Sequence, residues 1–410
     1  GSLNSSLLNG EIIKAAPVDI TKTKLPYDYY TDEDIAHRAI YVEASRGCPF
    51  QCEYCMSSLD SCVRYFPEEK LFLSFESLLS RGALNFKFID RTFNIDIPFA
   101  LKVLGFFKQR YQPGMMLHFE MIPDRLPDEL IEAIKDCPPG MLQFEIGIQT
   151  FNEKVAHRIK RPLNIGKIET NIRCLRDKTG VHIHSDLIAG LPGEGLQSFE
   201  SGFNRLIALN PQEIQVGILK RLRGAPIDRH TQEWDMVYSP YAPYEILQTS
   251  QIPFSEMQRI QRFSRYWNLT VNNGFFIHTA PLIYQGDTTL PPASCETSES
   301  TNFQQAPGNA FASFMQWSDW LYSKTNTTGN LNTIRLAKLL LEFLSTVKRI
   351  DEKTVAEALF KDHQRSNRPD IPGFLKKFGF SVSAEPASEP KASMPRQVRH
   401  HSAPNNQVQS

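Results

Sequence analysis

Between residues 39 and 219 the chain alternates short runs of β-forming residues with segments of helical periodicity. Strands are expected at AIYVEAS (39–45), LNFKFID (84–90), MMLHFEMI (115–122), LQFEIGIQ (142–149), VHIHSDLIAG (181–190) and EIQVGIL (213–219). Helical patterns separate them, at 67–81, 97–111, 127–136, 152–160 with 165–178, and 197–209. Such alternation is typical of βαβ units around a parallel sheet, which indicates the α/β class. Six units are fewer than a closed barrel needs, so we expect a partial (β/α)6 TIM-like barrel.

The composition changes on both sides of this region. Residues 1–38 lack clean periodicity and predict an extended lead-in to a core at 39–235. Residues 236–380 are expected to form a mainly helical domain, because apolar residues recur at helical spacing in 313–324 and 332–347. A polar loop is expected at 287–309, and a disordered tail rich in Ser and Pro is expected at 381–410.

Bulk composition excludes several classes of protein. The 45 basic and 45 acidic residues cancel, which gives no general attraction to nucleic acid or to an acidic membrane surface. No apolar run reaches the roughly 18 residues of a membrane helix, and the opening GSLNSSLLNG lacks the features of a signal peptide. The cysteine count, 7, is odd, which argues against a disulfide framework and for a reducing, cytoplasmic compartment.

Cys48, Cys52 and Cys55 crowd into CPFQCEYC, directly after the first expected strand. This spacing indicates a metal centre, for which several interpretations compete. A zinc site would need Cys62 or a distant histidine as its fourth ligand and lacks the usual second cysteine pair. A fully ligated electron-transfer cluster would also need Cys62, at a spacing foreign to the common ferredoxin run. Buried structural thiols have no packing reason to gather, and the remaining interpretation is a [4Fe–4S] cluster with one iron left open.

CPFQCEYC, with an aromatic residue before its last cysteine, resembles the motif of the radical S-adenosylmethionine (SAM) superfamily. The resemblance implies that Cys48, Cys52 and Cys55 ligate a [4Fe–4S] cluster whose open iron chelates the amino and carboxylate groups of SAM. It also implies that one electron cleaves the sulfonium into methionine and a 5′-deoxyadenosyl radical, which abstracts hydrogen from a substrate. The protein supplies binding, orientation and exclusion of water. A one-electron reductant such as flavodoxin or ferredoxin is an implied partner.

Groups that hold SAM are expected at the C-terminal ends of the strands, where βα barrels place their sites. The order of FEMIP, GIQTF, an arginine and DLIAGLPG resembles that of oxygen-independent coproporphyrinogen oxidases. By that resemblance Glu120 hydrogen-bonds the ribose hydroxyls, Gln149 helps to hold SAM, and Arg161 pairs with the methionine carboxylate. The superfamily's glycine-rich segment after the second strand is missing from FIDRTFN (88–94).

The same resemblance assigns further cofactor-binding residues. The backbone of Tyr54 and the turn that contains Gly190 and Pro192 would flank the adenine. Asp186 lies on an otherwise apolar strand, where an unpaired carboxylate is costly, so it binds a ligand or a histidine neighbour, His182 or His184.

Structural alternatives stay open for these residues. Glu120 could be a strand-end carboxylate paired with His118 or Arg125, and Gln149 could cap the next helix. Arg161 could belong to a solvated helix face, and GLPGE could be only a tight turn.

Three residues are weaker candidates for contact with the substrate. Asp90 and Glu145 are expected at the mouth or in the interior of the barrel, and Lys220 lies in the basic segment LKRLRGAPI (219–227). That segment would receive an anionic substrate or, on the alternative interpretation, form a solvated basic turn. The tryptophan-bearing helices beyond it are expected to be core.

Segments from about 25 to 378 resemble a cobalamin-associated branch of the superfamily with a helical C-terminal domain of unassigned function. The branch ordinarily carries a cobalamin-binding domain before this region, whereas the motif Asp-x-His-x-x-Gly occurs nowhere in the chain. Cobalamin-linked methyl transfer is therefore one expected outcome beside other uses of hydrogen abstraction from a small-molecule or peptide-sized substrate. A non-catalytic iron–sulfur or metal-binding module, with Cys62 as fourth ligand, is the alternative function.

Overall fold

The computed structural model describes residues 18–284, 308–366, 370–380 and 399–400. Its centre is a parallel sheet in the order β1-β4-β5-β6-β7-β8. The strands are β1 (Ile40–Val42), β4 (Asn85–Phe88), β5 (Met116–Met121), β6 (Leu142–Gln149), β7 (His182–Ala189) and β8 (Glu213–Ile218). All six strands coincide with the predicted runs, so the α/β class and the partial barrel are confirmed.

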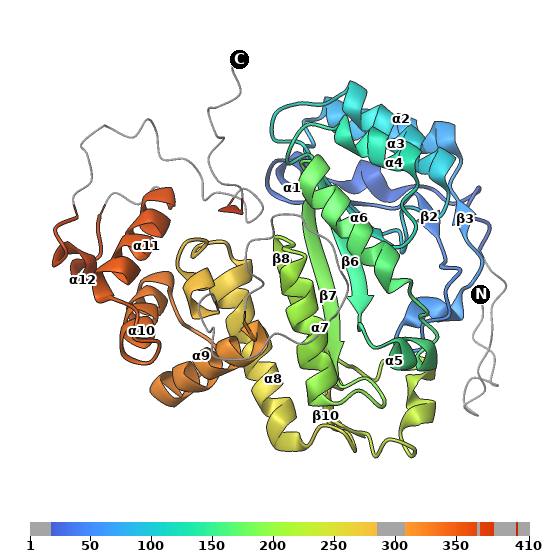
Figure 1. Cartoon of the computed structure of the whole chain (residues 1–410). Coiled ribbons are helices and arrows are strands. Elements are labelled where there is room, and N and C mark those ends of the chain that lie inside the picture. The colour runs from blue at the N-terminus through green and yellow to red at the C-terminus, as the bar shows by residue number, and fades with distance from the viewer. Residues whose placement is uncertain (1–17, 285–307, 367–369, 381–398, 401–410) are drawn as a thin grey trace, which may run out of the picture.

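A helix follows or precedes each strand and covers the outer face of the sheet (Figure 1). These helices are α2 (Glu68–Ser80), α3 (Ile97–Gln109), α4 (Asp128–Lys135), α6 (Ile165–Lys178) and α7 (Leu196–Ala208), whereas the short α5 (Glu153–Arg158) lies beyond the C-terminal end of β6. Side chains that accept hydrogen bonds from first-turn amides mark several starts, including Asp96 before α3 and Asn152 before α5. Local capping thus fixes the predicted boundaries to within a few residues.

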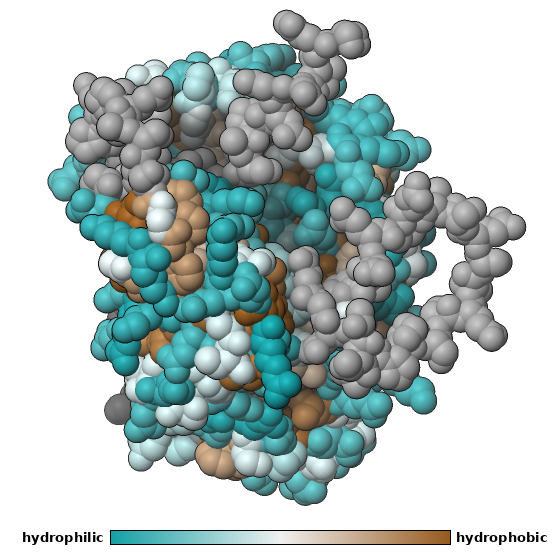
Figure 2. Space-filling model, turned by 60° about the vertical axis from the view of Figure 1, so that its left-hand side comes forward, coloured by the Kyte–Doolittle hydropathy of each residue, from teal (hydrophilic) through white to brown (hydrophobic). Residues whose placement is uncertain are grey.

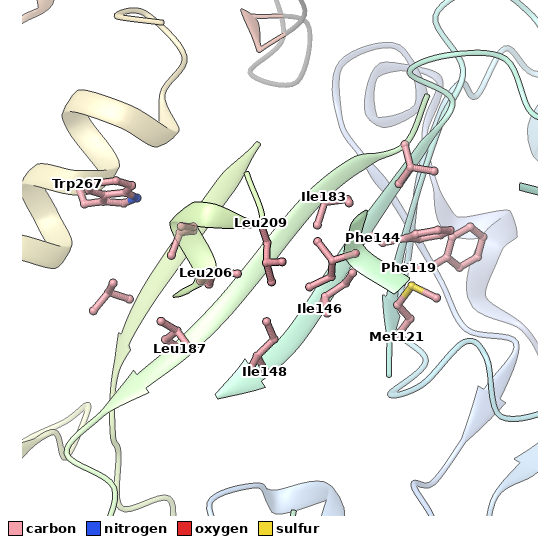
Figure 3. Close-up of a cluster of buried hydrophobic side chains, with 14 of the residues drawn as sticks. Phe119, Met121, Phe144, Ile146, Ile148, Ile183, Leu187, Leu206, Leu209 and Trp267 are labelled. Carbon is pink, nitrogen blue, oxygen red and sulfur yellow. The ribbon is translucent and has the colours of Figure 1, made fainter. Parts of the chain in front are cut away.

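The two faces of the sheet differ in chemistry because alternate residues of a strand point to opposite sides. The outer face is apolar, and Figure 3 shows its side chains on β6 and β7 packed with Leu206 of α7: Ile146, Ile148, Ile183 and Leu187. Alternate positions carry polar residues on the inner face: Lys87, His118, Glu120, Gln143, Glu145, Gln149, His182, His184, Asp186 and Glu213. Parallel strands are usually apolar on both faces, so a polar inner face indicates a lumen built for a polar ligand.

The lead-in before β1 is more ordered than expected. It contains a 3-10 turn, η2 (Pro26–Tyr29), and the helix α1 (Asp32–His37), and it buries Tyr27 in the main core. Two tyrosine hydroxyls satisfy the free edge of β1. Tyr30 Oη accepts from Tyr41 N at 3.0 Å and donates to Tyr41 O at 2.9 Å, and Tyr27 Oη accepts from Glu43 N at 2.7 Å. The lead-in therefore covers an edge that would otherwise offer unpaired backbone groups.

The region after β8 is mainly helical in its described parts. A short 3-10 helix, η4 (Pro226–His230), and a two-stranded hairpin of β9 (Val237–Tyr238) and β10 (Ile246–Gln248) precede the helices. The helices are α8 (Phe254–Trp267), α9 (Ala310–Thr325), α10 (Thr333–Thr346), α11 (Glu352–Arg365) and α12 (Gly373–Lys376). Trp267 stacks on Phe263 with 5.8 Å between ring centroids, and both are buried, as is Trp317. These aromatic residues are core, as predicted.

The predicted loop at 287–309 lies outside the described residues except for its last two positions. The predicted disordered tail at 381–410 also lies outside them, except for residues 399 and 400.

Figure 2 shows the side on which the C-terminal helices come forward, where hydrophobic patches are interspersed with hydrophilic surface. Across the described chain, no helix has the length and apolarity needed to cross a membrane.

Candidate active site

The cysteine loop leaves the sheet at β1 and is closed at its base. There β2 (Ser45–Arg46) pairs antiparallel with β3 (Arg64–Tyr65). Asp90, just past β4, accepts hydrogen bonds from the amides of Ala44 and Ser45 and from the Ser45 hydroxyl. Burial raises the pKa of this carboxyl to about 6. Asp90 therefore anchors the start of the cysteine loop.

The three motif cysteines lie together on this loop. Cys48 and Cys52 are buried and Cys55 is half-buried. Burial raises the pKa of the Cys48 thiol, and the proximity of Cys52 and Cys55 adds to the rise. The 3-10 turn η3 (Met56–Leu59) begins at Cys55, whose Sγ accepts from Ser57 N at 3.4 Å. Cys52 and Cys55 thus lie close enough to Cys48 to affect the pKa of its thiol.

Cys62 occupies a different position. Its side chain is exposed, near the end of the loop. A Cβ at Gly47, whose φ is +99°, would lie 2.1 Å from the carbonyl oxygen of Cys62, so the backbone crossing there requires glycine. The loop thus packs the backbone of Cys62 against its base, while the side chain of Cys62 stays exposed.

Whether this loop could hold a metal cluster depends on the side chains that are available as ligands. In the described parts of the chain, no three or more His, Cys, Asp or Glu side chains form a group that would hold a metal ion as they stand. The donor chemistry nevertheless fits a cluster, because three thiols share one loop and the half-buried guanidinium of Arg161 lies beside Cys52 and near Cys48. A cation at this position offsets the charge of thiolates.

Arg161 is the central cation of the site. It follows α5, and its Nη1 donates to Cys52 Sγ at 3.5 Å while its Nη2 donates to the carbonyl of Gly147. Burial by itself lowers the pKa of Arg161, but interactions with Tyr54 and Cys52 outweigh burial and raise the pKa above its ordinary value. The guanidinium of Arg161 therefore stays protonated. The buried Nε has no hydrogen-bond partner in the described chain. Arg161 is therefore not a solvated side chain, and one donor is left for an anionic ligand.

Gln149 and Gly147 shape the end of β6. Gln149 has a φ of 70°, in the left-handed region that few side chains adopt. Its Nε2 lies 2.3 Å from the point where a Cβ of Gly147 would stand, so a larger residue at 147 would displace the Gln149 side chain. The helix after Gln149 is capped by Asn152 instead, which removes the alternative capping role for Gln149.

The carboxylates of the inner face differ in their tendency to ionise. Burial, followed by the charge of Glu145, raises the pKa of Glu120 to about 7. A hydrogen bond from His118, whose Nε2 lies 3.0 Å from Glu145 Oε2, lowers the pKa of Glu145 to about 2. Burial also raises the pKa of Asp186, whose Oδ1 lies 3.4 Å from His184 Nε2. Carboxyl groups with such divergent pKa values are common in functional sites.

The GLPGE segment is a tight turn at the end of β7. Gly190 and Gly193 have φ values of +88° and +78°. A Cβ at Gly193 would lie 2.3 Å from Arg158 Nη1, and Arg158 also donates to the carbonyl of Pro192 at 2.8 Å. Lys220, by contrast, is exposed just beyond β8 and pairs through its backbone with Glu245. The turn and Lys220 therefore both lie at the C-terminal ends of the strands, as expected.

Two comparisons with families of known proteins match separate parts of the chain. A model of the radical SAM superfamily matches residues 42–206, which contain the cysteine loop and β1 to α7. The matched segment, residues 42–206, is a radical SAM domain. A second model, described as a protein of unknown function (DUF4080), matches residues 232–283. The superfamily expected from CPFQCEYC is confirmed.

Curated relatives match less than half of the chain. The chain is 27% identical over 186 residues to the ribosomal protein uS12 methylthiotransferase RimO of Trichlorobacter lovleyi, covering 42% of this chain and 41% of that protein. It is 26% identical over 203 residues to RimO of Synechocystis sp., covering 46% and 44%. The chain therefore spans less than half the length of these relatives.

Solved structures with a related arrangement are also radical SAM proteins. The methyltransferase TsrM from Kitasatospora setae shares 15% identity, covering 50% of this chain and 42% of that chain, with a TM-score of 0.44. Coproporphyrinogen III oxidase from Escherichia coli shares 15% identity, covering 59% and 56%, with a TM-score of 0.43. No activity follows from similarity at this level.

One residue of the site escapes prediction from the sequence. Glu53, between Cys52 and Cys55, is fully buried and contacts residues far along the chain. The only signal in the sequence was an acidic residue inside a cysteine motif, and nothing there indicated its partners.

Proposed function

We propose that this chain is a radical SAM enzyme in which Cys48, Cys52 and Cys55 hold a [4Fe–4S] cluster that cleaves SAM. The observation that carries the proposal is the proximity of these three thiols on one loop, with Arg161 donating to Cys52 and with Cys62 exposed. Three thiolates leave one iron open for a small chelating ligand. When bound, the reduced cluster and SAM supply a 5′-deoxyadenosyl radical for hydrogen abstraction.

The proposed roles of the cofactor-binding residues follow from their positions. Arg161 pairs with the SAM carboxylate, for which its unpartnered Nε supplies a donor. Glu120 accepts hydrogen bonds from the ribose hydroxyls, Gln149 helps to hold SAM, and the turn 190–193 with the backbone of Tyr54 flanks the adenine. Asp186 completes this polar lining from β7. Glu120, Gln149 and the turn 190–193 lie at strand ends or just beyond them, where barrels bind ligands, whereas Asp186 lies within β7 and Arg161 follows α5.

The substrate is proposed to enter the polar lumen. Glu145 is held ionised by His118 and lies 3.7 Å from Lys87 Nζ, which makes it a fixed anionic contact. Lys220 is a proposed contact at the mouth. Asp90 is instead proposed to act indirectly, because its oxygens are occupied by the start of the cysteine loop.

Anaerobic reconstitution tests the proposal. The chain should bind about four irons, and dithionite with SAM should yield 5′-deoxyadenosine, detected by chromatography and mass spectrometry. Cys55→Ala should abolish both results. A fully reconstituted sample that releases no 5′-deoxyadenosine would refute the proposal.

The alternative, a non-catalytic iron–sulfur or metal-binding module, requires Cys62 as a ligand. Cys62→Ala should leave iron content unchanged under our proposal and abolish binding under the alternative. Cobalamin-linked methyl transfer is the finer reaction that the branch resemblance implies. Methylcobalamin should then stimulate SAM turnover by the reconstituted chain once a substrate is present.

A further inference from the structure

Glu53 is a buried acid inside the cysteine motif. Its side chain is only 1% exposed, although it stands between two residues that are proposed to bind a cluster. A buried carboxylate is costly unless cations and hydrogen-bond donors surround it. Its retention beside three thiols therefore requires a specific set of partners.

Three basic residues provide those partners. Two nitrogens of the Arg229 guanidinium contact the two carboxylate oxygens: Nη2 lies 2.7 Å from Oε1, and Nε lies 2.9 Å from Oε2. His230 Nε2 lies 2.7 Å from Oε2 and is itself buried. Lys160 Nζ lies 3.4 Å from Oε1. The carboxylate thus joins the cysteine loop to residues more than 100 positions away in the sequence.

The backbone of Glu53 makes the same two connections. Its amide donates to the carbonyl of Ile159 at 3.0 Å, and its carbonyl accepts from the amide of Ile227 at 2.9 Å. Ile159 directly follows the last residue of α5, and Ile227 belongs to η4. Glu53 is therefore bonded to the segment after α5 and to η4 through both its backbone and its side chain.

The end of α5 also carries Arg161, the residue that contacts Cys52. Lys160 has a φ of 53°, a conformation that residues other than glycine rarely adopt without support. Glu53 supplies that support from the loop side through Ile159 and Lys160. Glu53 therefore contacts the two residues that directly precede Arg161, which donates to Cys52 Sγ.

We propose that Glu53 is a positioning residue, clamped by Arg229, His230 and Lys160, which fixes the cysteine loop between α5 and η4 and sets the reduction potential of the cluster. The inference rests on the proposed function. A fixed negative charge beside the cluster disfavours the reduced state, and its three partners limit that effect. Removing the carboxylate should therefore loosen the loop and make the cluster easier to reduce.

Glu53→Gln tests the clamp, because glutamine keeps the size of the side chain and removes its charge. The matched control is Glu43→Gln. Glu43 is also mostly buried and pairs with Arg46, whose Nε lies 2.8 Å from Glu43 Oε1. Glu43 precedes the first cysteine, however, and its pair with Arg46 makes no contact with α5 or η4. Arg229→Gln is a second variant, safer for folding because Arg229 is 54% exposed.

Three measurements are made on the full chain. In the reconstituted protein, Glu53→Gln should raise the midpoint potential followed by EPR and should speed iron release to a chelator about tenfold, the loss expected for one charge-assisted contact. In the metal-free protein, hydrogen exchange of residues 52–55 should accelerate. Arg229→Gln should accelerate that exchange and iron release, whereas Glu43→Gln should match the wild type throughout.

The outcomes separate this inference from the proposed function. If the wild type binds no iron, the proposed function fails, and hydrogen exchange in the metal-free protein still tests the clamp. Equal exchange in Glu53→Gln and Glu43→Gln would overturn the clamp. An unchanged potential in a variant that exchanges faster would overturn the electrostatic part.

Discussion

Glu120→Gln should make the protein more stable at pH 8 than the wild type, because Glu120 is placed where its ionisation is unfavourable. Burial and the charge of Glu145 raise its pKa to about 7. In the unfolded chain the group has its ordinary pKa of 4.5. The unfolded state therefore loses this proton first as the pH rises, and the free energy of unfolding falls between pH 4.5 and 7.

The size of the effect follows from that gap. At about 1.4 kcal/mol per pH unit, the difference between 4.5 and about 7 amounts to about 3 kcal/mol of stability, present below pH 4.5 and lost above pH 7. Glutamine has a similar volume and no charge, so the variant avoids this loss. Its gain in stability over the wild type should thus grow by up to about 3 kcal/mol from pH 5 to pH 8.

Urea unfolding of the metal-free protein at several pH values, followed by circular dichroism, measures this difference. Glu145→Gln is the comparison of opposite sign. His118 lowers the pKa of Glu145 to about 2, so its contribution is present above pH 4.5 and fades as the pH falls toward 2. That variant should be less stable than the wild type at pH 7. A Glu120→Gln protein with no greater advantage at pH 8 than at pH 5 would refute the reasoning.

Three further predictions concern single contacts. Arg161→Lys should lower the free energy of unfolding by about 1–3 kcal/mol in urea unfolding, because lysine cannot serve both Gly147 O and Cys52 Sγ; an unchanged value would contradict this. Gly193→Ala should lower the midpoint temperature more than Gly114→Ala, since both sites have positive φ but only Gly193 lacks room for a Cβ. Tyr30→Phe should expose the edge of β1 and promote self-association, measured by sedimentation velocity; a strictly monomeric variant would argue against edge protection.

Local patterns in the sequence were sufficient for the fold. The six strand runs and the helices between them were predictable because side-chain periodicity and caps such as Asp96 act within a few residues. The cysteine motif was predictable for the same reason, since Cys48, Cys52 and Cys55 share one short loop. The order of the lead-in was not, because the hydroxyls of Tyr27 and Tyr30 find their acceptors only when β1 lies at the edge of the sheet.

The sequence alone therefore determined the superfamily, the class of fold and the ligating cysteines that we propose. Only the tertiary structure decided the electrostatics of the site, and with them the pKa values of its carboxyl groups. The pKa values of Glu120 and Glu145 diverge because their neighbours come from adjacent strands and because burial depends on the whole barrel. Glu53 meets Arg229 and His230 across 176 and 177 positions of sequence, a distance over which no local pattern can specify a contact.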